Sequence, residues 1–511
     1  MAEKKAEAEP AVESKKYLRT MFLIGIGQCG GNVVSRMMRW LNEIPESYVN
    51  SMMKEAIGDR YLAINSGPEL KFLPVNLFRP RADASREHTV AIGEEKGSCF
   101  MKKGRFIHKE NWVKINQSIQ SLIPRDQISL PNLFIVVNSV GGGTGSGGAP
   151  FLIEKLRELF PDSFIWNLIF LPHEIHGKGK VHVPYYLAEM DRLINTKGFN
   201  IKKDRPYQAR GDARDEPTDD EVRECKITPI IVSNMRLKAG KCEGPQCTES
   251  TSDEAIIDNF NLIGVSLIDS LMFPLLLAGM ASDMEGRNRL DVWSKESGMD
   301  LTKMGKMSDL TDISRLMHFV VPLVLEGFSE EDLDVLNARN QPGQLQKKFE
   351  ECIELAIQEL AYTLDEDGRP YLRGTLAELE KKPYASNILG LISGDEAFAN
   401  GNTTDALAAA VNRIFNPNFL ECTWYRRPDD KKVLLLLGGA DVRDFRMWAD
   451  ELHRLLQRNI SDQELMRNIN FTQKELRGVY ETVANQIIPK KEAATEPPAR
   501  PVKPDAPATG K

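Results

Sequence analysis

Residues 141–147 have the composition and spacing of a phosphate-binding segment. They read Gly141-Gly142-Gly143-Thr144-Gly145-Ser146-Gly147, between an apolar run at 132–137 and a helically spaced run at 151–156. Because glycine has no Cβ, consecutive backbone N–H groups can converge on an anion, and a helix starting there adds its positive dipole end. The hydroxyl groups of Thr144 and Ser146 can donate to the same phosphates. A Gly/Ser linker has similar composition but is not normally enclosed by a strand and a helix, so the sequence predicts a strand, a phosphate-binding turn and a helix.

A second glycine motif lies near the N-terminus. The apolar run 21–26 predicts a strand, and Gly27-Gln28-Cys29-Gly30-Gly31-Asn32 follows it before a helical pattern. Gly25, Gly27 and Gly30 fit G-x-G-x-x-G, so an NAD-dependent oxidoreductase is one alternative. That alternative expects an acidic residue after the second strand, where Asn65 and Ser66 stand, and it gives residues 141–147 no function. Two phosphate turns in one sheet fit a nucleoside triphosphate, and the P-loop pattern G-x-x-x-x-G-K-[ST] is absent from the sequence.

The rest of the chain predicts an α/β fold, because strand patterns alternate with helical ones. Strands are predicted at 21–26, 60–65, 90–92, 132–137, 164–171, 227–232, 319–325, 387–392 and 432–437. Helices are predicted to begin at 33 and 253 and to lie at 112–122, 151–156, 185–194, 309–317, 344–360, 404–414, 445–457 and 462–487. In a parallel sheet covered by helices, the phosphate turns meet at the carboxyl ends of the strands.

One apolar stretch, 262–280, is long enough to cross a membrane. Asp269 and Pro274 interrupt it, and no cluster of Lys or Arg flanks it. These features favour a helix buried inside the protein over direct insertion into a membrane.

Composition favours a soluble, cytoplasmic protein of several domains. The 511 residues are 41% hydrophobic and 27% charged, and the net charge of −7 argues against a nucleic-acid partner. Seven cysteines and an N-terminus without an apolar signal core indicate a reducing compartment.

The two glycine motifs together resemble those of the tubulin/FtsZ superfamily, and the resemblance extends over roughly 21–437. It implies a Rossmann-like GTP-binding domain with a parallel sheet, a long central helix and a second, smaller α/β activation domain. The expected division is a disordered arm (1–18), a nucleotide-binding domain (19–252) with a charged insertion (197–224), the central helix (253–281), an insertion (282–308), the activation domain (309–440), C-terminal helices (441–488) and a disordered tail (489–511). The motifs do not decide between FtsZ, CetZ and tubulin-like subfamilies.

The resemblance also implies how GTP would be hydrolysed. An acidic loop after the central helix acts on GTP held by the neighbouring subunit, and Asp309 and Asp312 match that loop; residues 288–291 are a rival position. Capping of a helix N-terminus is an alternative role for Asp309. Hydrolysis across a head-to-tail contact gives a filament of identical subunits. A GTP-binding regulator or scaffold that hydrolyses weakly and does not polymerise is the main alternative, because Met307 replaces the asparagine that usually precedes the acid.

The resemblance implies further contacts with the nucleotide. Mg²⁺ is expected to accompany GTP or GDP. Asn65 and Ser66 match the second phosphate-side turn, and Gly93 and Gly97 match the third, which senses the γ-phosphate. Asp253 takes the place of the asparagine that normally recognises guanine, with Asn259 as a rival. Regulators that bind the termini are possible partners.

Two weaker patterns concern metal binding and thiol chemistry. His173, Glu174, His176 and His182 fit no zinc spacing, so no metal site is predicted. A helix N-terminus could lower the pKa of Cys29, although packing against a nucleotide explains this residue better.

Overall fold

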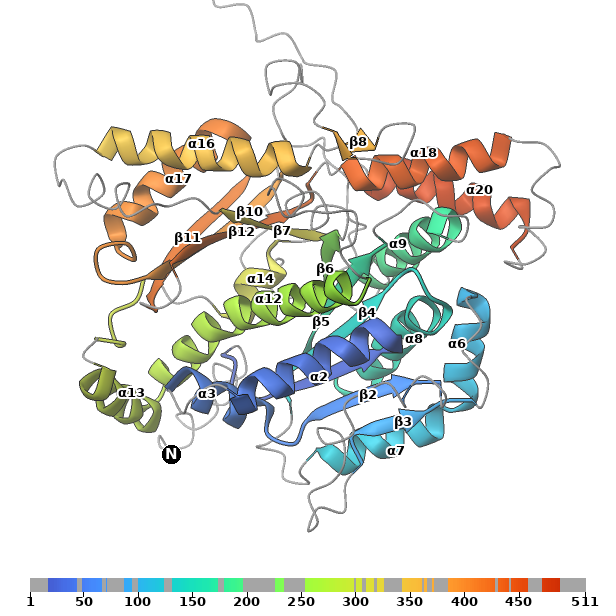
Figure 1. Ribbon diagram of the computed structural model, residues 1–511, viewed down its shortest axis with the longest axis horizontal. Helices are drawn as coiled ribbons and strands as arrows, with labels where there is room; N and C mark the ends of the chain where they lie inside the picture. The colour runs from blue at the N-terminus through green and yellow to red at the C-terminus, as the bar shows by residue number, and fades with distance from the viewer. Residues whose placement is uncertain are drawn as a thin grey trace, which may run out of the picture.

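The computed structural model contains one ten-stranded sheet in the order β11-β10-β12-β7-β6-β5-β4-β1-β2-β3 (Figure 1). It describes residues 17–43, 48–66, 70, 87–93, 100–123, 131–172, 179–195, 226–233, 253–297, 300–305, 309–316, 319–325, 342–360, 363–364, 370–371, 385–427, 431–440, 443–457 and 471–487. The strands are β1 (Met21–Ile26), β2 (Tyr61–Asn65), β3 (Thr89–Ala91), β4 (Leu133–Ser139), β5 (Phe164–Leu171), β6 (Ile227–Ser233), β7 (Val320–Leu325), β10 (Asn387–Gly394), β11 (Phe419–Arg426) and β12 (Lys432–Gly438), beside a small antiparallel pair, β8 (Thr363–Leu364) and β9 (Pro370–Tyr371).

Strands β1 to β7 pair with one another in parallel, as predicted. Alternate residues of each strand enter different cores, because successive side chains point to opposite faces. In β1, Phe22 and Ile24 belong to one buried cluster, whereas Met21 and Leu23 belong to the other. The sheet is therefore buried on both faces, which explains its continuous apolar runs.

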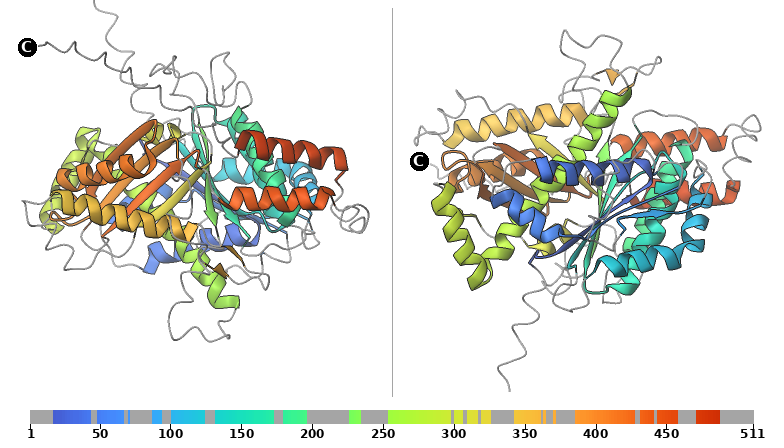
Figure 2. Two further views of the ribbon diagram at one scale, coloured as in Figure 1. Left: turned by 90° about the horizontal axis from the view of Figure 1, so that it is seen from above. Right: turned by 60° about the horizontal axis from the view of Figure 1, so that its bottom comes forward.

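Helices cover both faces (Figure 2). They are α2 (Gly27–Glu43), α3 (Tyr48–Ile57), α6 (Met101–Glu110), α7 (Trp112–Leu122), α8 (Gly143–Leu159), α9 (Gly179–Asn195), α12 (Asp253–Ala281), α13 (Met284–Ser297), α14 (Leu310–Ser314), α16 (Pro342–Leu360), α17 (Gly401–Phe415), α18 (Arg443–Gln457) and α20 (Gln473–Thr482), which continues into a π-helix at Val483–Ile487. The side chains of α2, α3 and α12 join one core, and those of α7, α8, α9, α16 and α17 join the other.

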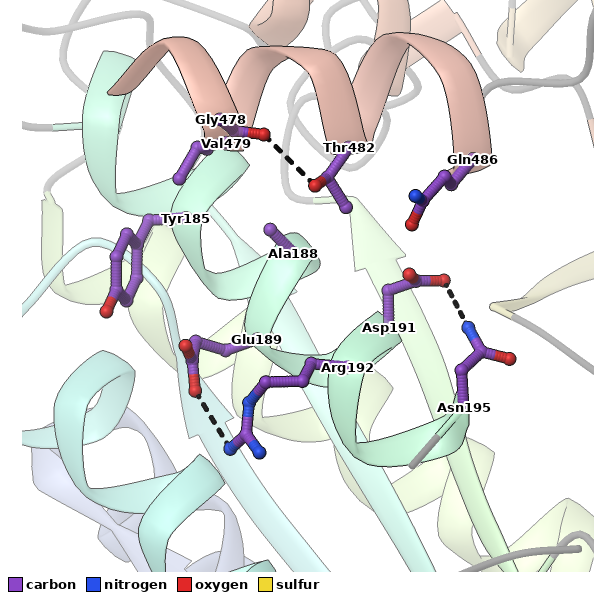
Figure 3. Close-up of a pocket in the computed structure, with 10 residues that line it drawn as sticks. All are labelled: Tyr185, Ala188, Glu189, Asp191, Arg192, Asn195, Gly478, Val479, Thr482 and Gln486. Carbon is purple, nitrogen blue, oxygen red and sulfur yellow. Dashed lines mark hydrogen bonds and ion pairs between the residues drawn. The ribbon is translucent and has the colours of Figure 1, made fainter. Parts of the chain in front are cut away.

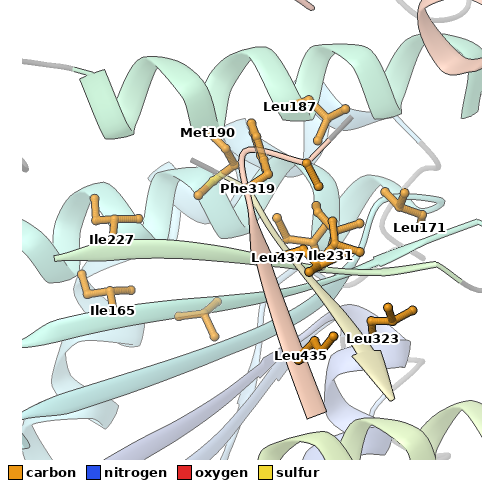
Figure 4. Close-up of a cluster of buried hydrophobic side chains, with 14 of the residues drawn as sticks. Ile165, Leu171, Leu187, Met190, Ile227, Ile231, Phe319, Leu323, Leu435 and Leu437 are labelled. Carbon is orange, nitrogen blue, oxygen red and sulfur yellow. The ribbon is translucent and has the colours of Figure 1, made fainter. Parts of the chain in front are cut away.

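The two halves of the sheet meet at β6 and β7, where a single residue pair, Ile230 and Val320, is in register. Buried apolar side chains from both halves pack together there, including Ile231, Phe319 and Leu437 (Figure 4). Strand β12 is antiparallel to both β7 and β10, which places it between the first half and the β10–β11 pair. The sheet thus crosses the predicted boundary between the nucleotide-binding and activation domains, and the domain division itself remains a prediction.

The longest predicted helix is α12, and its apolar segment is a core helix. Among the described residues, Asn261–Ala281 is the one helical segment apolar and long enough to span a membrane, and 83% of the window is buried inside the protein. Pro274 lies within the helix without ending it.

Several elements differ from the sequence prediction. Helices α6 and α13 and strand β11 were not predicted: α6 is rich in Lys, Arg and His, α13 is largely polar, and β11 alternates half-buried with buried residues. The predicted helix 462–487 is described from Gln473 onward. Helices α2 and α8 begin within the glycine motifs rather than after them. Close backbone contacts at Gly30 and Gly147 leave room only for glycine, and the low helix propensity of glycine hides the helix start in the sequence.

Candidate functional site

The site is built around two glycine segments, here called the first (residues 27–32) and the second (residues 141–147). They follow the neighbouring parallel strands β1 and β4, whose residues Ile26 and Asn138 are in register. Gly27 has a φ of +73°, and a Cβ placed on it would lie 3.2 Å from the backbone nitrogen of Gly145. A Cβ on Gly145 would lie 2.7 Å from the carbonyl oxygen of Ser139. The predicted meeting of the two segments at the carboxyl edge of the sheet is therefore a direct backbone contact.

Two helix N-termini accompany this contact. Helix α2 begins at Gly27, and α8 begins at Gly143 with the extended Gly142 as its N-cap (φ −101°, ψ 167°). The first N–H groups of a helix have no intrahelical acceptor, and the helix dipole places partial positive charge beside them. The edge of the sheet thus presents backbone donors that suit an anion.

The glycines of the second segment divide into two groups. Among the described residues, a Cβ on Gly142 would meet no atom within 4 Å, and one on Gly141 would meet only Pro172, at 3.8 Å. A Cβ on Gly147, in contrast, would lie 2.1 Å from the carbonyl oxygen of Met101 in α6. Gly147 therefore has a packing role, whereas Gly141 and Gly142 leave backbone accessible to a ligand.

The hydroxyl groups of the second segment are largely enclosed. Thr144 is 7% exposed and Ser146 is fully buried, with its hydroxyl donating to the carbonyl oxygen of Gly142. A phosphate hydrogen bond from Ser146, as predicted, would have to replace this internal one.

A chain of polar side chains connects the first segment to the end of β2. The Gln28 amide donates to Asn32 Oδ1 over 2.9 Å, and Asn65 Nδ2 donates to Gln28 Oε1 over 3.4 Å. Asn65 Oδ1 in turn accepts from the backbone N–H of Ser66 at 2.9 Å. Ser66 is 1% exposed, and its hydroxyl has no hydrogen-bond partner within the described part of the chain. Four predicted ligand residues thus lie together.

The third predicted turn is partly described. Gly93 follows β3 with a φ of +71°, and the backbone N–H of Ile92 donates to the carbonyl oxygen of Asn65 over 2.9 Å. This places Gly93 beside the second turn, while Gly97 lies outside the described residues.

Cys29 is an unreactive thiol in this setting. Burial raises its pKa to about 12, and a hydrogen bond with Ser139 only partly opposes that rise. The raised pKa argues against the alternative in which the helix N-terminus activates the thiol.

The predicted catalytic loop forms the capped N-terminus of helix α14. The Asp309 carboxylate accepts from the backbone N–H groups of Thr311, at 2.7 Å, and Asp312, at 3.3 Å, and Asp312 Oδ2 accepts from the Asp309 N–H at 2.9 Å. This reciprocal arrangement is a capping box.

Asp312 is 6% exposed and pairs with Arg315 at 3.2 Å, whereas Asp309 is half-buried. Burial raises the pKa of Asp312 to about 6. The capping alternative is confirmed for both residues; catalysis remains a prediction.

The acidic loop lies away from the glycine segments of the same chain. It precedes β7, and β6 and β5 separate β7 from β4 in the sheet. Three strand spacings correspond to about 14 Å across the sheet. Because β4 to β7 are parallel, the loop before β7 and the glycine segment after β4 also lie toward opposite edges of the sheet.

Three predictions concern residues whose side chains are not described. Asp253 and Asn259 both lie in the first turns of α12, but only the backbone of that part is described. His173, Glu174, His176, Met307 and the insertion 197–224 lie outside the described residues. Within the described residues, no group of three or more His, Cys, Asp or Glu side chains could hold a metal ion.

Sequence reasoning missed a pocket of about 430 Å³ between α9 and the C-terminal helices (Figure 3). Asp191 lines it, although only 4% exposed, and accepts from Asn195 Nδ2 at 3.0 Å. Burial raises the pKa of Asp191 to about 6. Arg192 turns instead to Glu189, at 3.2 Å. This pocket is built from α9 and the helices after residue 472, not from the glycine segments.

Comparison with known proteins gives a partial sequence match. The GTPase domain of the tubulin/FtsZ family matches residues 20–201. The chain is 28% identical over 178 residues to the tubulin-like protein CetZ3 of Haloferax volcanii, and 24% identical over 174 residues to the tubulin beta chain of Saccharomyces cerevisiae. These matches cover 34% and 30% of this chain and 41% and 37% of the relatives, so the chain matches well under half of their length.

Solved structures give a likeness over a longer part of the chain. A GTPγS-bound protofilament of CetZ2 from Haloferax volcanii has a TM-score of 0.53 at 14% identity, with coverage of 85% of this chain and 99% of the other. CetZ from Methanosaeta thermophila has a TM-score of 0.50 at 16% identity, with coverage of 90% and 99%. The likeness supports the predicted α/β, Rossmann-like fold. Residues 20–201 are thus similar to the GTPase domain of the tubulin/FtsZ family, and the fold of the chain resembles that of CetZ structures.

Proposed function

We propose that this protein binds GTP at the two glycine segments and hydrolyses it in head-to-tail assemblies of its own subunits. The observation that carries GTP binding is the contact between Gly27 and Gly145, which joins two helix N-termini at one edge of the sheet. Such an edge can surround a triphosphate with backbone donors. Similarity to a GTPγS-bound CetZ2 protofilament supports the choice of nucleotide and the assembly.

The position of the acidic loop supports completion of the active site between subunits. The loop precedes β7, and β7 lies about 14 Å across the sheet from β4, so we propose that a second subunit supplies Asp309 and Asp312. A carboxylate can orient and deprotonate an attacking water. Asp309 is the better candidate, because Asp312 is buried and paired with Arg315. Mg²⁺ would enter with the nucleotide as its phosphate complex.

The experiment combines nucleotide analysis with sedimentation. We expect the purified chain to bind GTP, and its hydrolysis rate per subunit to rise with protein concentration in Mg²⁺-containing buffer. Material should pellet with GTPγS and not with GDP. NAD binding without GTP binding would support the oxidoreductase alternative instead.

A variant of the second segment tests the site without disturbing the fold. Gly142 has extended backbone angles, and a Cβ placed on it would meet no atom of the described part of the chain within 4 Å, so we expect Gly142→Val to fold. Its side chain would occupy space needed by phosphates, and we expect GTP affinity to fall about tenfold or more. Gly401→Ala, at an open position on α17, is the matched control and should bind GTP normally.

A GTP-binding regulator that does not polymerise is the second candidate. The capping box favours it, because structure alone accounts for both acidic residues. This candidate predicts GTP binding with hydrolysis that is slow and independent of protein concentration.

A further inference from the structure

Three polar side chains form a buried network under the second glycine segment. Asn138 in β4, Asn167 in β5 and Tyr186 in α9 are each 0% exposed. Asn167 Nδ2 donates to Asn138 Oδ1 over 2.8 Å and to the carbonyl oxygen of Val136 over 2.9 Å. The Tyr186 hydroxyl lies 2.6 Å from Asn167 Oδ1 and 3.0 Å from Asn138 Oδ1. Burying polar groups is costly unless they are paired, so such a network needs a reason to be there.

Asn138 joins this network to both glycine segments. It is in register with Ile26, the residue before Gly27, and its Cβ would lie 3.4 Å from a Cβ placed on Gly145. Its Nδ2 is buried and has no hydrogen-bond partner in the part of the chain that the structure describes. The side chain nearest the second segment is therefore also the one whose hydrogen bonds are incomplete.

The network can adopt two hydrogen-bond arrangements. A phenol carries one proton, so the Tyr186 hydroxyl donates to Asn167 or to Asn138 but not to both at once. Burial raises the pKa of Tyr186, which keeps this proton on the phenol. The choice of acceptor changes the bonding of Asn138 directly beneath the phosphate segment.

Tyr186 also belongs to a helix that contacts the C-terminal part of the chain. Its neighbour Tyr185 packs on the ring of Phe471 with centroids 4.7 Å apart, and Val181 joins a cluster with Leu476 and Val479. Helix α9 thus lies between the C-terminal helices and the network.

We propose that Asn138, Asn167 and Tyr186 form a positioning network that holds the second glycine segment in place relative to α9, and that Tyr186 thereby sets nucleotide affinity without contacting the nucleotide. This inference rests on the proposed GTP binding. It assigns Tyr186 a role at a distance, through Asn138, and it makes α9 the route by which the C-terminal helices influence the nucleotide site.

The test compares two tyrosines that are adjacent on α9. Tyr186→Phe removes the hydroxyl of the network and keeps the ring, whereas Tyr185→Phe removes the hydroxyl of the neighbouring tyrosine, which lines the pocket between α9 and the C-terminal helices (Figure 3). The full chain is titrated with a fluorescent GTP analogue, and thermal unfolding is recorded with and without GTP. The Asn138→Ala variant and the Asn138→Ala/Tyr186→Phe double variant complete a cycle.

We expect Tyr186→Phe to weaken nucleotide binding about fivefold, the net effect of one hydrogen bond, and to reduce the increase in Tm that GTP produces. Tyr185→Phe should stay within about twofold of wild type, and the double variant should bind no more weakly than Asn138→Ala, since the two act as a unit. A lower Tm for Tyr186→Phe with unchanged affinity would show a purely structural role and overturn the inference. Absence of GTP binding by the wild-type chain would overturn the proposed function, and the inference with it.

Discussion

The two glycine segments and the acidic loop differ in what holds them. In the glycine segments, backbone meets backbone: a Cβ on Gly30 would lie 2.1 Å from the carbonyl oxygen of Val137, and one on Gly25 would lie 2.3 Å from that of Gly30. In the acidic loop, side chains hold the backbone, through the capping box of Asp309 and Asp312. Gly25 and Gly30 therefore have no room for an added atom, whereas Asp309 can be replaced by any residue that still caps the helix. A substitution in the acidic loop can therefore change function with less effect on stability than a substitution at Gly25 or Gly30.

The largest expected effect is on stability at the glycine contact. Gly30→Ala places a methyl group against the Val137 carbonyl oxygen, and overpacking of this kind costs about 3 kcal/mol. Urea unfolding measures the loss. Gly401→Ala is the control, because it adds the same methyl group where none of the described residues has an atom within 4 Å. Equal stability of the two variants would contradict the described packing.

The second largest effect is expected on GTP hydrolysis, from a variant that removes the carboxylate of Asp309 but keeps its helix cap. Asparagine caps a helix as well as aspartate does, so Asp309→Asn should keep the stability of wild type while hydrolysis falls about a hundredfold. Polymerisation-dependent GTP turnover and thermal unfolding are measured on the same samples. Unchanged turnover would mean that Asp309 is a cap and nothing more.

Asp309→Ala sharpens that comparison. It removes the acceptor for the Thr311 and Asp312 N–H groups, and loss of an N-cap costs about 1 kcal/mol. We expect this destabilisation in urea unfolding in addition to the loss of turnover seen with Asp309→Asn.

The acidic loop should contribute a pH dependence to stability, in the same direction as Asp191, whose pKa burial also raises to about 6. The pKa of Asp312 rises from 3.8 to about 6 on folding, so the folded state holds a proton that the unfolded state has lost, and stability falls as pH rises between these values. From pH 5 to pH 7 the loss is about 1 kcal/mol for one such group. His108, whose pKa is lowered to about 4, acts in the opposite direction. Wild type should therefore be compared with Asp312→Asn by urea unfolding at both pH values, and identical slopes for the two would contradict the raised pKa.

The smallest effect concerns the reactivity of the Cys29 thiol in the first glycine segment. Because the pKa of Cys29 is about 12, almost none of it is thiolate at pH 8, and iodoacetamide should label it far more slowly than an exposed cysteine. Peptide mass spectrometry of the folded protein, with unfolded protein as the control, measures the labelling. Rapid labelling in the folded state would show an activated thiol.

The sequence predicted the sheet well because β1, β4 and β5 are continuous apolar runs between polar residues. It also predicted that the two glycine segments meet, since both follow parallel strands. It did not predict where the helices start, because glycine is a poor helix former in isolation and only packing against Met101 and Val137 explains Gly147 and Gly30. Strand β11 was missed because only every second residue is buried, and its alternation includes charged Glu421 and Arg426.

The network of Asn138, Asn167 and Tyr186 shows a different limit. A polar residue inside each of two buried strands was a visible signal, yet nothing in the spacing indicated that the two would share a hydroxyl from α9. The hydrogen bonds of Asn138 with Asn167 in β5 and with Tyr186 in α9 join residues that are 29 and 48 positions apart in the chain. Such partners become evident only when register and helix packing are known together.

Mixing two inactive variants tests the central claim most directly. Gly142→Val keeps the acidic loop but should lose nucleotide binding, and Asp309→Asn keeps the glycine segments but should lose the acid. If hydrolysis needs one region from each of two subunits, an equimolar mixture should regain GTP turnover, up to about a quarter of the wild-type rate in a random head-to-tail assembly. A mixture no more active than the sum of its parts, under conditions in which the wild type turns over GTP, would contradict a site shared between subunits.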